Sequence, residues 1–260
     1  MEAERNLKCI DMRKLFFIIF FFTVSVAISK ENSDTTKVKS DTTKHPLKVS
    51  GEVSFNTNGI APIPAFALGK PTVMANIVLT KNRFSYNPQL SYGLNLKPWI
   101  IDNWFRYKMI VKPKFELRAG FNISMFFSEY ETPDAEVWQG QRWIALELAG
   151  LYRLSNTSSL GLMVWYDEGL EDGTISGYFI NFVAEKTDIR ISKHVLMAIN
   201  IQTFYINYTD NNDGFFISPK VSFSLNKPSF FVFGQFIQPL TSNIDPYPDF
   251  QWNIGIGYSF

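Results

Sequence analysis

The chain has 260 residues, of which 46% are hydrophobic and 16% aromatic, with 25 Lys plus Arg against 24 Asp plus Glu. This length suits one sizeable structural unit, and a formal net charge of +1 excludes a global electrostatic attraction to nucleic acid or to an anionic membrane. The single cysteine, Cys9, excludes an intramolecular disulfide and a thiolate metal cluster.

An apolar run near the N-terminus has the order of a secretory signal peptide. Basic residues precede the segment from Leu15 to Ile28, and small residues close it before polar sequence begins. The run is shorter than the roughly 20 residues that a transmembrane helix needs, which disfavours a membrane anchor. We predict a signal peptide over residues 1–29, with translation starting at Met1 or Met12.

The following segment, 30–46, is polar and contains a short duplication. Ser33–Lys37 (SDTTK) returns as Ser40–Lys44. Without apolar residues the segment cannot offset its ordering entropy by burial. We predict a flexible periplasmic linker, with a tether to the cell wall or to a partner as the alternative.

From residue 47 to residue 260 hydrophobicity alternates with a period of two, which indicates strands with two different faces. The runs are about 10 to 14 residues long, more than the usual soluble strand and sufficient to cross a membrane at a tilt. The expected strands are 48–58, 72–82, 84–96, 99–111, 114–130, 137–154, 158–168, 174–186, 193–208, 215–225, 229–239 and 249–260.

The connections between these strands alternate in length. They are tight at 82–83, 112–113, 155–157 and 226–228, and longer at 59–71, 131–136, 209–214 and 240–248. Short turns on one side and longer loops on the other are typical of outer-membrane barrels, with both termini on the short-turn side. The pattern predicts an all-β fold, a transmembrane antiparallel up-and-down β-barrel of about 12 strands over 47–260, with both termini periplasmic.

A soluble sandwich or lipocalin-like barrel also alternates, with its apolar face inward. A soluble protein would carry Lys and Glu on the polar face, whereas many of these strands carry Ser, Asn, Gln and Gly there. We therefore expect an enclosed polar face. The continuous run Phe230–Phe233 predicts a bulge or an interior contact. Aromatic residues near strand ends suit interfacial girdles: Trp99, Trp143, Tyr152, Tyr166, Tyr208, Trp252, Tyr258 and Phe260.

The last segment resembles the terminal strand of Gram-negative outer-membrane β-barrel proteins. Phe250, Trp252, Ile254, Ile256, Tyr258 and Phe260 alternate there with polar residues and glycines. In that group a C-terminal aromatic residue of this kind is similar to the signal read by the barrel assembly machinery, so the resemblance implies this role for Tyr258 and Phe260. It also implies the cell outer membrane as location, with lipid, lipopolysaccharide and other outer-membrane proteins as candidate partners, and no particular substrate.

With the apolar face outward, a set of charged side chains falls on the inner face. Opposite charges on adjacent strands can pair, and a paired network would narrow or fill the lumen because unpaired buried charge costs several kcal/mol. A charged constriction that orders small polar solutes is a second and compatible interpretation. The predicted pore-lining residues are Glu52, Asp102, Arg106, Lys108, Glu116, Arg118, Glu147, Arg153, Glu185 and Lys220.

Loops on the expected outer side are acidic around 129–136, 168–172 and 210–213. Such clusters can bind Ca²⁺, but the spacing of a full calcium loop is missing, so we prefer a solvated acidic rim that favours cation entry and predict no metal. We also predict no cofactor and no catalytic residue, because His45 and His194 lie in the linker and toward the periplasmic end.

The sequence thus predicts a passive channel or porin for small polar solutes, and no enzyme. The alternative is a plugged structural barrel or a subunit of an outer-membrane complex. An outer-membrane enzyme is the weaker third hypothesis, because neither histidine is placed near the outer side and the loops look short for a substrate cleft with paired carboxylates.

Overall fold

The computed structural model describes residues 46–60, 67–131, 136–208, 212–225, 229–244 and 250–260. The predicted signal peptide and all but the last residue of the predicted linker lie outside these residues. No helix in the described part of the chain is both long enough and apolar enough to cross a membrane.

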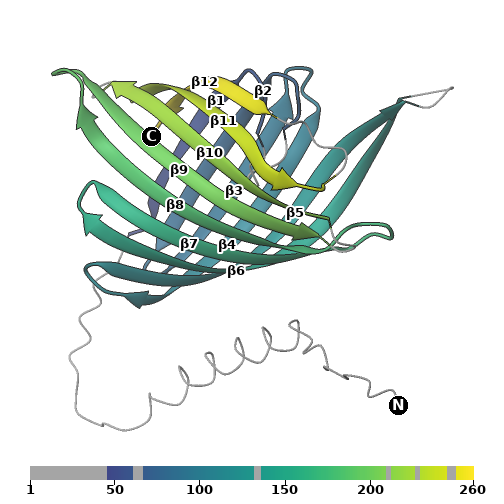
Figure 1. Ribbon diagram of the computed structural model, residues 1–260, viewed down its shortest axis with the longest axis horizontal. Helices are drawn as coiled ribbons and strands as arrows, with labels where there is room; N and C mark the ends of the chain where they lie inside the picture. Colours follow the sequence, from purple (N-terminus) through teal and green to yellow (C-terminus); the bar gives the residue numbers. More distant parts are fainter. Residues whose placement is uncertain (1–45, 61–66, 132–135, 209–211, 226–228, 245–249) are drawn as a thin grey trace, which may run out of the picture. The chain divides into compact units, whose positions relative to one another are not determined.

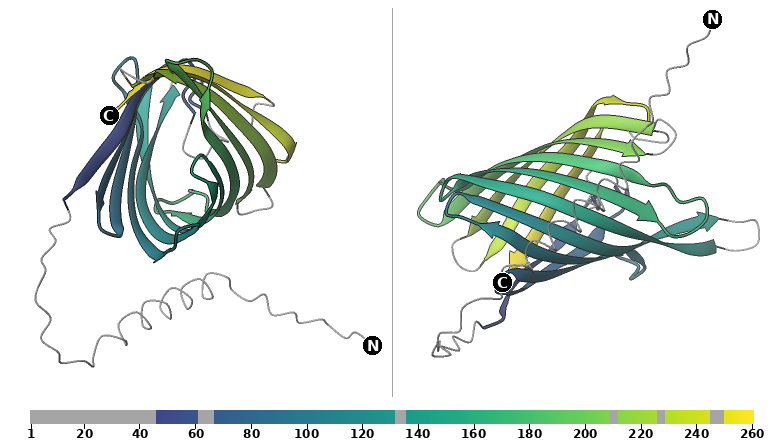
Figure 2. Two further views of the ribbon diagram at one scale, coloured as in Figure 1. Left: turned by 90° about the vertical axis from the view of Figure 1, so that its left-hand side faces the viewer. Right: turned by 90° about the horizontal axis from the view of Figure 1, so that it is seen from below.

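Twelve antiparallel strands close into one barrel, in which each strand pairs with its neighbours in the sequence and β1 pairs with β12. Figure 1 shows the strands side by side and oblique, and the left view of Figure 2 looks into the barrel. The strands are β1 (Lys48–Asn56), β2 (Thr72–Lys81), β3 (Phe84–Gly93), β4 (Pro98–Val111), β5 (Phe115–Glu131), β6 (Glu136–Ser155), β7 (Ser158–Gly169), β8 (Gly177–Arg190), β9 (Val195–Tyr208), β10 (Asn212–Leu225), β11 (Phe230–Ser242) and β12 (Gln251–Ser259).

The barrel closes where the two ends of the strand series meet. β1 and β12 pair from Glu52 opposite Ser259 to Asn56 opposite Gly255. The backbones of Gly51 and Phe260 then exchange two hydrogen bonds of 2.9 Å each. The predicted fold and the strand number are confirmed. Some strand bounds differ, because polar residues at strand ends pair as readily as apolar ones: β8, for example, covers 177–190 instead of 174–186.

The longest connections lie together at one end of the barrel, as predicted, but the connection expected at 209–214 is short, because β10 begins at Asn212. One end, which we call the short-turn end, has the connections 82–83, 112–114, 156–157, 191–194 and 226–229. The other end, which we call the loop end, has the connections 57–71, 94–97, 132–135, 170–176, 209–211 and 243–250. The β5–β6 hairpin has the two longest strands and projects farthest there (Figure 1).

Apolar side chains cover the outer face of the barrel, and polar ones are enclosed. On β12, Ile254 is 56% exposed, whereas the neighbouring Asn253 is 2% exposed. A soluble barrel has the opposite arrangement, because its apolar face must leave water. The exposed apolar face therefore suits hydrocarbon. Tyr258 and Phe260 also lie on this face, and their role as an assembly signal stays a prediction.

Phe231 and Phe233 of the apolar run on β11 pack inside the barrel, whereas Phe230 and Val232 are exposed on its outer face. An added Cβ on Gly257 would overlap the ring of Phe231, and one on Gly255 would overlap the ring of Phe233. The two glycines of β12 thus leave room for large rings from the next strand. The predicted interior contact is confirmed, and the register shift between β10 and β11 lies farther along, at Phe215.

Candidate functional site

A charged cluster lies on the inner wall formed by β4, β5 and β6, toward the short-turn end. At its centre the fully buried side chain of Glu147 accepts two hydrogen bonds from Arg106, of 2.8 and 2.9 Å. Arg118 donates a third, of 2.9 Å, and the indole N–H of Trp165 a fourth, of 3.1 Å. A Cβ on Gly120 would lie 3.1 to 3.3 Å from Arg106 and Glu147, so glycine leaves room for this pair to meet across β5.

A second acid, Glu116, lies nearer the short-turn end. Its carboxylate is 2.9 Å from the ammonium group of Lys108 and 3.4 Å from the guanidinium group of Arg153. Together with the Glu147 group, this wall carries four basic and two acidic side chains, a net charge of +2. The pairing across neighbouring strands that the sequence predicts is present here.

The remaining predicted pore-lining residues lie apart from this cluster. Asp102 is 3% exposed and accepts a hydrogen bond of 3.1 Å from Asn122. Glu52 and Lys220 line a separate polar cavity on the opposite wall. Glu185 is exposed and lies opposite Ser159, near the short-turn end.

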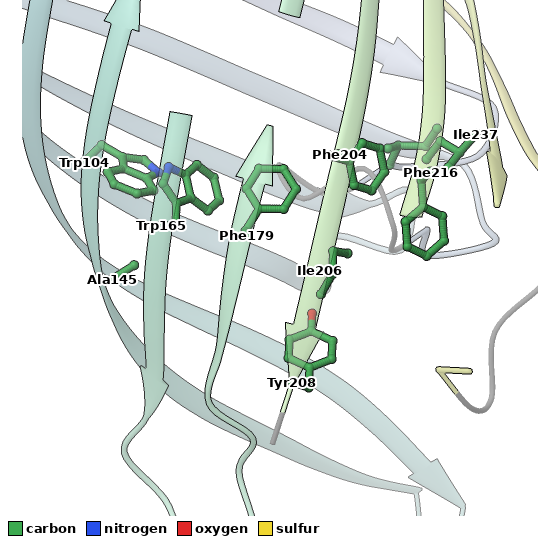
Figure 3. Packing of buried hydrophobic residues seen from close by; sticks show 10 residues of the cluster. Trp104, Ala145, Trp165, Phe179, Phe204, Ile206, Tyr208, Phe216 and Ile237 are labelled. Carbon is green, nitrogen blue, oxygen red and sulfur yellow. The ribbon is translucent and has the colours of Figure 1, made fainter. Parts of the chain in front are cut away.

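A row of aromatic rings crosses the inner face of the barrel (Figure 3). It runs from β4 to β10 through Trp104, Trp165, Phe179, Phe204 and Phe216, with successive ring centroids 4.8, 4.9, 5.6 and 5.0 Å apart. These distances are typical of packed aromatic pairs. The row therefore forms an apolar layer across the lumen.

The first contact of this row skips two strands. Trp104 lies on β4 and Trp165 on β7, and the small residue Ala145 on β6 lies in the same cluster. Trp104 also contacts the guanidinium group of Arg106, which lies 4.2 Å from the ring centroid. The aromatic row and the charged cluster are thus in direct contact.

A cavity of about 310 Å³ lies between this row and the loop end, and aromatic and acidic residues line it. We call it the aromatic-acidic cavity. Four tryptophans line it together with two carboxylates and several small polar residues. The lining residues are Trp99, Trp104, Trp143, Trp165, Phe126, Tyr208, Asp102, Asp167, Asn122, Ser124, Ser128, Gln141, Ala67, Ala145 and Ile175.

The stem of the β1–β2 connection separates this cavity from a polar one. Ala67 lines the aromatic-acidic cavity, and Ile60, its bridge partner, lines a cavity of about 190 Å³ on the other side. Ile60 is buried within the cluster that contains the aromatic row. The stem is held by backbone hydrogen bonds from Leu68 to Gly59, of 2.7 Å, and from Gly59 to Lys70, of 3.2 Å. The stem therefore lies inside the barrel and reduces its free cross-section.

The β7–β8 loop is attached beside the aromatic-acidic cavity. Glu171 accepts hydrogen bonds of 2.6 Å from the backbone N–H and from Nε of Arg142. The indole N–H of Trp143 donates to the carbonyl oxygen of Ile175 at 3.2 Å. These contacts hold residues 170–176 against β6, where Ile175 completes the lining of the cavity.

Two of the acidic residues predicted to form a solvated rim are ion-paired. Glu171 pairs with Arg142, and Glu129 pairs with Lys97 at 2.7 Å and with Lys70 at 3.4 Å. Within the described ranges, no group of three or more His, Cys, Asp or Glu side chains is arranged to hold a metal ion. The net negative charge of the rim is therefore smaller than its acidic residues alone suggest, because basic residues from other strands and loops neutralise part of it.

Three aromatic residues assigned to the girdles lie inside instead. Trp99 and Tyr208 are buried, and Trp143 lines the aromatic-acidic cavity. Trp143 and Tyr208 lie two positions from the inward-facing residues Ala145 and Ile206, so the alternation in the sequence already indicates that they point inward. Trp99 follows a register shift between β3 and β4, which no periodicity reveals.

A closed barrel with an apolar outer face and an enclosed polar face defines the class of this protein: it is an outer-membrane β-barrel protein. Several solved structures are similar to this chain. A KdgM porin in complex with disordered oligogalacturonate matches with a TM-score of 0.53 and 12% identity, over 81% of this chain and 99% of that one. The COG4313 outer membrane channel from Pseudomonas putida F1 matches with a TM-score of 0.49 and 10% identity, over 86% of this chain and 100% of that one.

The NanC porin matches with a TM-score of 0.46 and 8% identity, over 82% of this chain and 99% of that one. No family model matches the sequence. The comparison with curated proteins finds no match either. At these identities the likeness concerns the fold.

Proposed function

We propose that this protein is a passive outer-membrane channel for small polar solutes. The observation that carries the proposal is the enclosed polar and charged inner face. Glu147, Asp102 and Asn253 are buried inside the barrel, whereas the alternate positions are apolar and exposed. A barrel that served only as a membrane anchor would not need cavities lined by polar groups on both of its walls.

The charged cluster would act as the selective region of this channel. Its basic side chains outnumber its acidic ones, so the short-turn half of the lumen favours anions, while Asp102 and Asp167 make the loop half favour cations. Charges of both signs in series suit small solutes that are neutral, zwitterionic or singly charged. The acidic oligosaccharide named for the KdgM porin suits the aromatic-acidic cavity poorly, because two carboxylates would repel it.

Planar-bilayer recording of the refolded protein tests the proposal. We expect discrete current steps, with a conductance below that of wide porins because the aromatic row and Ile60 occupy part of the lumen. Insertion is verified in the same preparation by the resistance of the folded barrel to protease. Folded, inserted protein that produces no current steps would contradict the channel.

A plugged barrel is the second candidate, and one observation favours it. Ile60 packs with the aromatic row, so apolar side chains from a connection and from the wall meet inside the lumen. In a plugged barrel, current steps appear only after a large ring is removed, as in Phe204→Ala. In the channel, the wild-type protein already conducts and Phe204→Ala raises the conductance.

A further inference from the structure

We propose that the aromatic-acidic cavity binds small organic cations, such as solutes with a quaternary ammonium group. If cation binding is a step of transport, this inference rests on the proposed channel function. As a binding site, it requires only the folded barrel. Binding and conduction can therefore be tested separately.

The first argument is the unbalanced charge of the cavity. Asp102 and Asp167 both line it, and no lysine, arginine or histidine is among the described lining residues. No ion pair found in the described ranges includes either carboxylate, and Asp102 is 97% buried, with an amide hydrogen bond from Asn122. The charge of Arg106 acts on Asp102 without a direct contact, because the guanidinium group is hydrogen-bonded to Glu147. Because a buried carboxylate without a direct ion pair is costly, a cationic solute would supply that contact.

The second argument is the chemistry of the rings. The indole N–H of Trp143 is used by Ile175, and that of Trp165 is used by Glu147. These two side chains therefore present π faces and ring edges to the cavity, with no free donor. The face of an indole attracts a cation, and Trp104 already binds the guanidinium group of Arg106 in this way.

The third argument concerns the alternatives. An anionic solute would meet two carboxylates. A neutral sugar would leave both carboxylates without an opposite charge. At about 310 Å³ the cavity lies at the lower end of small-molecule pockets, which suits a compact solute.

The test compares choline with 3,3-dimethylbutan-1-ol, which has the same shape without the charge. Quenching of tryptophan fluorescence is followed during titration of the folded protein in detergent, since four tryptophans line the cavity. We expect saturable binding of choline and about tenfold weaker binding of the alcohol. Equal binding of the two, absent choline binding, or tighter binding of maltose than of choline would overturn the proposal.

Two charge-removing variants locate the site. Asp102→Asn and Asp167→Asn should each weaken choline binding about tenfold, because each removes one charged partner. Asp188→Asn removes the same charge from an exposed position on β8 near the short-turn end and should bind choline as the wild type does. Unchanged affinity in both cavity variants would refute the site, and Asp167→Asn keeps the test valid if Asp102→Asn fails to fold.

Conductance separates this inference from the channel. Choline binding that depends on Asp102 or Asp167, in a barrel without current steps, would support the site and contradict the channel. Current steps without choline binding would support the channel and refute the site.

Discussion

Replacing Glu147 by glutamine should destabilise the barrel strongly. The change keeps the size of the side chain but leaves Arg106 and Arg118, which are 13% and 38% exposed, side by side without their shared counter-charge. Glu147 accepts four hydrogen bonds, and removing one partner of a buried charge pair costs about 3–5 kcal/mol. Because water solvates part of Arg118, we take the low end and expect a loss of about 3 kcal/mol.

Glu116→Gln is the matched control on the same wall. Its partners, Lys108 and Arg153, are 37% and 38% exposed, so water can solvate both after the change. We expect this variant to lose about 1 kcal/mol, near the upper value for exposed pairs. Both free energies of unfolding are measured by urea titration of the protein in lipid vesicles, with tryptophan fluorescence as the signal.

A double variant shows whether the loss comes from the pair itself. Arg106→Gln with Glu147→Gln should cost less than the sum of the two single changes, because the second change removes the charge that the first one left unpaired. Additive losses that are no larger than the loss of Glu116→Gln would show that these side chains are solvated independently. The assignment of the charged cluster to an enclosed inner face would then be refuted.

Three further predictions follow from the same geometry. Arg118→Ala removes one positive charge from the lumen and should raise the cation preference of the open channel, seen as a shift of the reversal potential in a salt gradient; an unchanged potential would place this side chain outside the conduction path. Gly255→Ala should lower the free energy of unfolding by about 1–3 kcal/mol, because the added Cβ overlaps the ring of Phe233. Gly234→Ala, which has open space around the added Cβ, should lower it by less than about 0.5 kcal/mol. Equal losses in the two variants would contradict the packing. Hydrogen bonds from Arg142 lower the pKa of Glu171, so the contact between them is present above the ordinary glutamate pKa and is lost as the pH falls through the lowered value. Hydrogen exchange of the β7–β8 loop amides should therefore stay slow through the usual glutamate range, and Glu171→Gln should make this exchange fast at neutral pH. Slow exchange in Glu171→Gln would refute the attachment of the loop.

The fold could be predicted from the sequence because a membrane barrel repeats one simple pattern. Each strand must place apolar side chains toward lipid at every second position, and the alternation from Phe250 to Phe260 shows this without any knowledge of neighbours. The even strand number and the alternation of turns and loops follow from the same repeat. The strand bounds are less certain because the pattern fades where both faces become polar.

The sequence predicted which residues point inward, and it predicted some of the ion pairs that they form. Glu147, Arg106 and Arg118 lie on adjacent or next-adjacent strands of a meander, so their proximity follows from the strand order. Their shared hydrogen bonds also depend on Gly120, whose importance appears only when strands of known register are placed side by side.

The aromatic-acidic cavity was decided by the tertiary structure. Trp104 and Trp165 lie three strands apart, and Asp102 and Asp167 are brought to one cavity only by the closure and curvature of the barrel. Ile60 and Ala67 enter the lumen from a connection, where no periodicity indicates direction. The sequence by itself determined which face of each strand meets lipid, because that depends on the local alternation. Which inward side chains meet across the lumen depends on register, shear and the path of a loop, and these arise from contacts between residues far apart in the chain.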